Sequence, residues 1–176
     1  MEAASPVGQA KAGMAVCRGI TSLCLTMIAW ILTLSAIIGI ANDNWSTLNS
    51  ELGCGLKAAF GLFVCADSCM FFLICWDGAN LVILCYTQTM CNCECYHMNF
   101  SLQLASFGML LIGAIIHGTN DPDNINWTFW FCLISALLCL ILGIMWKITQ
   151  KMKRFMKKEA SGALEGMGAG AIAGMI

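Results

Sequence analysis

The stretch "ITSLCLTMIAWILTLSAIIGIA", residues 20–41, decides the fold class of this chain. It contains 22 residues and no charged side chain. An α-helix rises about 1.5 Å per residue, so this stretch is long enough to cross the roughly 30 Å of hydrocarbon in a bilayer. It exceeds the roughly 7–15 apolar residues of a cleavable signal peptide, and we therefore expect it to stay in the protein as a membrane anchor.

The composition of the whole chain also indicates a membrane protein. Of the 176 residues, 59% are hydrophobic and 11% are charged, which leaves too few charges to solvate the surface of a soluble domain. The long apolar runs lack the alternation of β-barrel strands. The sequence therefore predicts an all-α membrane protein, a bundle of four transmembrane helices, with spans at residues 20–41, 69–90, 100–117 and 127–146.

The second span can be placed in two frames. A frame that starts near Ala58 includes Asp67, whereas residues 69–90 include Asp77 and Asn80, and we favour the later frame. A carboxylate inside a span costs about 2.5–3.5 kcal/mol on insertion scales and needs a partner or water. Asp77 and Asn80 lie one turn apart, so they predict an ion or proton path or a docking point for a partner helix. The alternative is that Asp77 lies near the membrane interface.

Positive charges gather at the two ends of the chain. Eight of the nine Lys and Arg residues flank the first and last spans, and only Lys57 lies between them. The positive-inside rule then places both termini in the cytoplasm, and we expect the plasma membrane as the location. Residues 1–18 would be the cytoplasmic N-terminus and residues 19–150 the transmembrane domain. Residues 151–176 would be a basic, then glycine-rich cytoplasmic tail. We expect no stable helix in its last part, residues 159–176, because glycine costs a helix roughly 1 kcal/mol per residue.

Three N-x-S/T sequons occur in the chain. In this topology Asn44 and Asn126 fall on the outer side and are glycosylation candidates, whereas Asn99 falls on the cytoplasmic side and is expected to remain unmodified.

Three cysteines alternate in the turn between the second and third spans: Cys91, Cys93 and Cys95 in "MCNCECYHMN". Reducing conditions in the cytoplasm oppose disulfides there. Strict alternation differs from the paired spacing of zinc sites, and the chain has no C-x-x-C pair of a thiol oxidoreductase. We expect palmitoylation of these juxtamembrane thiols, with unmodified thiols or metal and redox chemistry as the alternatives.

Three further cysteines, Cys54, Cys65 and Cys69, fall in the first outer segment under this topology. The oxidising side of the membrane favours pairing, so they are disulfide candidates. All three cannot pair with one another, so one is free, lies inside the second span or bonds another chain.

The same segment carries a family resemblance. Trp45 and the later "GLFVCADSC" are similar to the W…G-L-W…C…C signature of the claudin and peripheral myelin protein 22 superfamily, with matching positions at Trp45, Gly61, Leu62, Phe63, Cys65 and Cys69. Phe63 replaces the second tryptophan of that signature, and only three residues separate the two cysteines. The resemblance covers about residues 20–154. It implies a small β-rich extracellular layer on the four-helix bundle, and a role in cell contact, barrier formation or escort of another membrane protein.

These observations predict a tetraspan integral membrane protein with a structural, cell-contact or membrane-organising role, and not an enzyme. The alternative is a channel, or an auxiliary channel or receptor subunit, that uses Asp77 and the acidic outer loops; a membrane thiol-redox enzyme comes third. The expected partners are the lipid bilayer and other membrane proteins, in a homo-oligomer or a larger complex. No nucleic acid, cofactor or metal is expected. Ser135, Cys139 and Gly143 form a small-residue stripe on the fourth span that predicts packing within the bundle.

Overall fold

Four long α-helices form the structure, a computed structural model that describes residues 6–49, 54–87, 95–120 and 127–173, with side chains in residues 16–42, 54–83, 98–119 and 127–155 apart from Lys153. The helices are α1 (Pro6–Asn49), α2 (Cys54–Thr87), α3 (Cys95–Asn120) and α4 (Trp127–Ala173). The predicted all-α bundle is therefore confirmed. None of the described residues forms a strand, and most of the segment expected to form the β-rich layer is the first half of α2.

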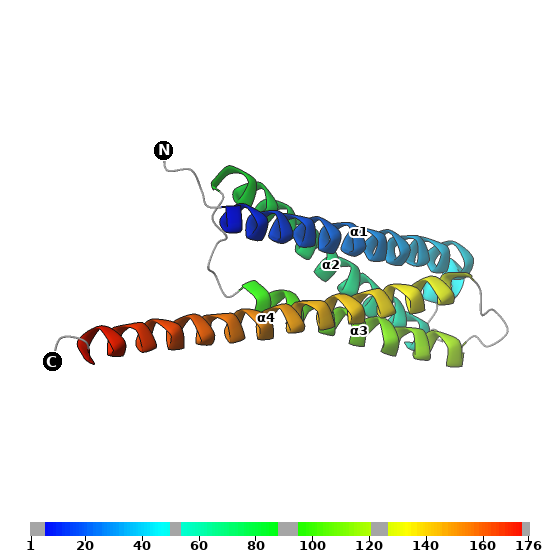
Figure 1. Ribbon diagram of the computed structural model, residues 1–176. Coiled ribbons are helices and arrows are strands. Elements are labelled where there is room, and N and C mark those ends of the chain that lie inside the picture. The colour runs from blue at the N-terminus through cyan, green and yellow to red at the C-terminus, as the bar shows by residue number, and fades with distance from the viewer. Residues whose placement is uncertain (1–5, 50–53, 88–94, 121–126, 174–176) are drawn as a thin grey trace.

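The four helices form a closed ring (Figure 1). Each helix packs against the next one in sequence, and α4 packs against α1. The start of α1 and the end of α4 lie at one end of the bundle, which we call the terminal end. The first and last helices therefore leave the bundle on one side. That this side faces the cytoplasm stays a prediction.

Every helix contains an apolar window long enough to span a membrane. The windows are Val16–Asn42, Cys54–Ile83, Met98–Thr119 and Trp127–Met152, and each exceeds the roughly 20 residues that a bilayer requires. The chain is an integral membrane protein with four candidate spans.

The second helix differs from the expected span. It begins at Cys54 and not near Cys69, so the earlier frame describes it better. Lys57 lies in its first turn, where a long side chain can reach the headgroup layer. Asp67 lies near the middle of the apolar window, half-buried against the bundle. Charged residues alone were therefore a poor guide to the start of this helix.

The glycine-rich tail also differs from its prediction, because α4 continues without a break to Ala173. Between the glycines lie Ala, Leu, Met, Glu and Lys, which are strong helix formers. A tail that extends an existing helix also avoids the unfavourable nucleation step. Both effects offset the entropic cost of glycine.

Small residues bring the helices close together in the core. Alanines occupy fully buried positions on all four helices: Ala29, Ala36, Ala59, Ala66, Ala114 and Ala136. At Gly113 a Cβ atom would lie 2.6 Å from the ring of Phe63, so this glycine makes room for the largest side chain of the core. Ser135, Cys139 and Gly143 are all buried, which confirms that the small-residue stripe packs inside the bundle.

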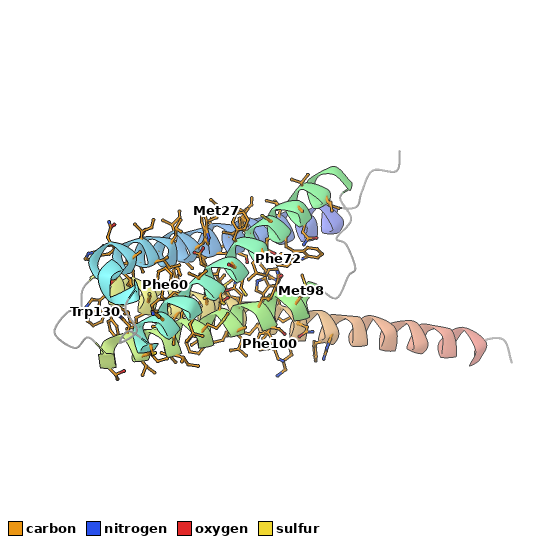
Figure 2. All side chains as sticks on the ribbon, turned by 180° about the vertical axis from the view of Figure 1, so that it is seen from behind. Met27, Phe60, Phe72, Met98, Phe100 and Trp130 are labelled. Atoms are coloured by element: carbon orange, nitrogen blue, oxygen red, sulfur yellow. The ribbon has the colours of Figure 1, made fainter. Side chains whose placement is uncertain are left out.

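Large apolar side chains cover the outside of the bundle. Met27, Phe72 and Trp130, labelled in Figure 2, are among many that are 40% exposed or more. Such a surface is stable in contact with lipid and would favour aggregation in water. The outside of the bundle therefore supports the membrane assignment independently of helix length.

Candidate functional site

A group of buried polar side chains lies inside the bundle near the terminal end. We call it the polar cluster; it consists of Ser22, Thr26, Asp77, Asn99 and Gln103, and none of these residues is more than 9% exposed. The cluster draws on α1, α2 and α3. Asp77 is six residues from the end of its apolar window, or about 9 Å along the helix.

Asp77 is the acceptor at the centre of this group. Asn99 donates from Nδ2 to Asp77 Oδ1 over 2.7 Å, and Ser22 donates from Oγ to Asp77 Oδ2 over 3.4 Å. These two bonds tie α2 to α3 and to α1. From the sequence we expected Asp77 to need a partner or water in the membrane. The structure gives it two partners, a neutral amide and a neutral hydroxyl.

A second layer of the cluster lies one helical turn deeper. Gln103 donates from Nε2 to Thr26 Oγ1 over 3.3 Å, and the Thr26 hydroxyl donates to the Ser22 carbonyl over 2.9 Å. α1 and α3 lie diagonally across the ring and have no direct backbone contact in the described residues. The Gln103–Thr26 bond therefore crosses the interior of the bundle.

Helical spacing places these residues on shared faces. Ser22 and Thr26 are four residues apart on α1, as are Asn99 and Gln103 on α3, so each pair lies on one side of its helix. Sequence reasoning selected Asp77 and Asn80 together, but Asn80 is only half-buried, and the partners of Asp77 come from other helices. The polar repeat at residues 99, 103 and 106 of the third span was the signal that could have revealed them.

Polar contacts continue from the cluster toward the middle of the bundle. The hydroxyls of Thr33 and Ser135 lie 2.7 Å apart, and Ser135 donates to the Ala29 carbonyl over 2.8 Å. Closer to the opposite end Ile40 and Leu110 are fully buried, together with the polar side chains of His117 and Thr128. Among the described residues, the larger group of buried polar side chains therefore lies at the terminal end.

Two contacts close the interior around the cluster. At the terminal end, Arg18 donates from Nη1 to Thr149 Oγ1 over 3.2 Å, which joins α1 to α4. At mid-bundle, the sulfur atoms of Met70 and Cys139 lie 3.5 Å apart across the other diagonal. Side chains from facing helices therefore meet inside the bundle at both levels.

The outer-segment cysteines lie on α2. Cys65 and Cys69 are free thiols one turn apart, and Cys54 lies at the start of the same helix. Helix positions four residues apart hold their Cβ atoms about 5–6 Å apart, whereas a disulfide needs about 3.5–4.5 Å. α2 is therefore incompatible with the Cys65–Cys69 disulfide that the outer-loop placement allowed.

We expect Cys65 and Cys69 to remain thiols in the purified chain. Alkylation with N-ethylmaleimide under denaturing, nonreducing conditions, followed by peptide mass spectrometry, should find both residues modified. A peptide in which the two cysteines are unmodified and joined to each other would contradict the position of α2.

Several predicted sites fall outside the described residues or side chains. Cys91, Cys93 and Asn126 lie outside the described residues. Cys95 begins α3 and Asn44 lies in α1, but their side chains are not described. Lipidation and glycosylation therefore stay predictions.

Asn99, the third sequon, is described, and its amide is enclosed by the polar cluster at 2% exposure. Among the described residues, no three His, Cys, Asp or Glu side chains come together as metal ligands. Comparisons of the chain with protein-family models, with curated proteins and with solved structures give no match.

Proposed function

We propose that this tetraspan membrane protein organises or accompanies other membrane proteins, and that the extension of α4 beyond the bundle is its docking element. α4 contains 47 residues and is therefore about 70 Å long. Figure 1 shows that its last part projects well past the other three helices at the terminal end. This projection is the observation that carries the proposal.

An uncovered apolar face of α4 runs from the end of its apolar window into the projection. Ile148 and Met152 lie in the last part of the window and Phe155 lies just beyond it. The three follow the i, i+4, i+7 spacing of one helix side and are 54%, 50% and 63% exposed. α4 continues straight out of its span, whereas an amphipathic helix that binds lipid alone lies in the plane of the membrane. A protein surface is the partner that fits an apolar face in this orientation.

Basic residues border this face. Lys147, Lys151 and Arg154 are exposed and recur at the same helical spacing. The Lys147 ammonium lies 4.6 Å from the centre of the Phe100 ring, which links the base of the projection to α3. We infer a partner helix with an apolar side and acidic flanks.

The proposal does not extend to cell contact, which the family resemblance implied. Such a role needs a substantial outer segment, but only residues 43–53 and 120–126 lie between the apolar windows at this end of the bundle. The residues of the resemblance lie on α1 and α2. The lipid-facing sides of the helices and the projection of α4 offer a partner protein larger surfaces than the segments between the helices do.

Photo-crosslinking tests the proposal in intact cells that express the full chain. Benzoylphenylalanine at position 155 should capture a second polypeptide, identified by mass spectrometry of the adduct. The matched control is the same probe in place of Ile115, which is 57% exposed on the lipid side of α3 and should capture lipid. Lipid adducts alone at both positions would contradict a protein partner at this face.

An ion path is the second candidate, and the polar cluster favours it. In a single copy such a path would have to pass the Met70–Cys139 contact and the buried side chains of Ile40 and Leu110 beyond it. Conductance of the purified chain in a planar bilayer, abolished by Asp77→Asn, would support this candidate. Conductance that survives the substitution, or none in the wild type, would exclude a path built on Asp77.

A further inference from the structure

The carboxylate of Asp77 is buried without a positively charged partner. Its neighbours are the neutral donors Asn99 and Ser22, and no Lys, Arg or His side chain of the described residues forms an ion pair with it. Arg18, one turn from Ser22 on α1, instead donates to Thr149. A carboxylate in such surroundings is stable only if its charge is compensated.

The same region contains oxygen atoms without a hydrogen-bond partner. Asn99 Oδ1, Gln103 Oε1 and Ser106 Oγ are buried and form no hydrogen bond. Asn99 Oδ1 belongs to the amide group whose nitrogen donates to Asp77 over 2.7 Å. Each unsatisfied buried group costs about 1–3 kcal/mol, and three in succession on one face of α3 favour the binding of a ligand here.

Each of the four neutral side chains of the cluster already donates one hydrogen bond. Ser22 and Asn99 donate to Asp77, Gln103 donates to Thr26, and Thr26 donates to a carbonyl. A proton on Asp77 would supply one donor and could satisfy one acceptor. A cation would neutralise the carboxylate and bind several of the oxygens together.

We infer that Ser22, Thr26, Asp77, Asn99 and Gln103 form a binding site for one monovalent alkali cation, sodium, between α1, α2 and α3. All of the available ligand atoms are oxygens, which hard cations prefer. The single carboxylate matches a single positive charge, whereas divalent ions are usually bound by several carboxylates. Occupation joins three helices at the terminal end and stabilises the bundle. The inference does not depend on the proposed function.

Thermal unfolding of the full chain in detergent micelles tests the site. Sodium, potassium and choline chlorides are compared at one ionic strength and one pH, because a ligand that binds the folded state raises the unfolding temperature. The wild type should gain stability with sodium in a saturable manner, relative to choline. Asp77→Asn should remove this gain, and Asp67→Asn, the same substitution ten residues earlier on α2, should keep it.

A second variant covers the case in which Asp77→Asn fails to fold. Gln103→Leu keeps the carboxylate and removes one amide oxygen, so the sodium concentration at half-effect should rise about tenfold, the equivalent of about 1.4 kcal/mol. Equal unfolding temperatures in sodium and choline would overturn the inference, as would a sodium effect that survives in Asp77→Asn. Stability that depends on pH and not on the cation would identify a protonated carboxylate and would also overturn it.

Discussion

Replacing Gly39 with leucine is expected to lower the free energy of unfolding by roughly 1–3 kcal/mol. Gly39 is buried where α1 meets the start of α4. A Cβ atom there would lie 2.5 Å from Thr128 Cγ2 and 2.8 Å from the Trp127 ring. Thr128 is 2% exposed and β-branched, so it has little freedom to move aside. A larger side chain therefore forces the two helices apart.

Gly61→Leu is the matched control, because no atom lies within 4 Å of the position that its Cβ would occupy. The control should be neutral or slightly stabilising, since leucine favours a helix over glycine by up to about 1 kcal/mol. Both variants can be compared with the wild type by circular dichroism during thermal unfolding in one detergent. Equal losses in the two variants would show that α1 and α4 do not approach each other at Gly39.

Replacing Asn99 with leucine is expected to cost about 1.5–3 kcal/mol, the range for a buried hydrogen bond to a charged group. The change removes the 2.7 Å donor and leaves Asp77 with the longer bond from Ser22. The Asp77→Leu, Asn99→Leu double variant should lose less than the sum of the single changes, because it leaves neither an unpaired carboxylate nor an unpaired amide.

This double-mutant cycle is best measured in choline chloride, so that the coupling between the two side chains is separated from any sodium binding. Asn80→Leu is the control, since Asn80 lies one turn from Asp77 but is only half-buried. It should show no comparable coupling with Asp77→Leu. Additive losses for Asp77 and Asn99 would contradict the contact between α2 and α3.

The number and the approximate positions of the spans could be predicted, because they depend on short stretches of the sequence taken one at a time. Uncharged runs of about 20 residues suffice to predict a span, and residues 20–41 and 127–146 lie inside two of the apolar windows. The start of α2 was harder, because helix geometry tolerates Lys57 and Asp67 when one reaches the headgroup layer and the other faces the bundle. Charge counting could not distinguish these cases from a loop.

The candidate site was predictable only in part, because its partners come from different helices. The sequence selected Asp77 from the cost of a buried carboxylate, and the structure gives it donors on α1 and α3. Asn99 had been interpreted only as a sequon. The period of Asn99, Gln103 and Ser106 indicates one face of a helix, but the register between helices is set by packing. Contacts such as Gln103–Thr26 therefore required the three-dimensional arrangement.

The pairing of α1 with α4 has a consequence for biogenesis. The first helix reaches the membrane early in synthesis, but Ser135, the partner of Thr33, is made about a hundred residues later. Until then, the side of α1 that carries Thr33 and Gly39 lacks the α4 surface against which it packs in the finished bundle. The Thr33 hydroxyl keeps its bond to the Ala29 carbonyl within α1, whereas the space at Gly39 stays unfilled in a chain truncated before residue 127. We therefore expect such a truncated chain to be less stable in the membrane than the full chain.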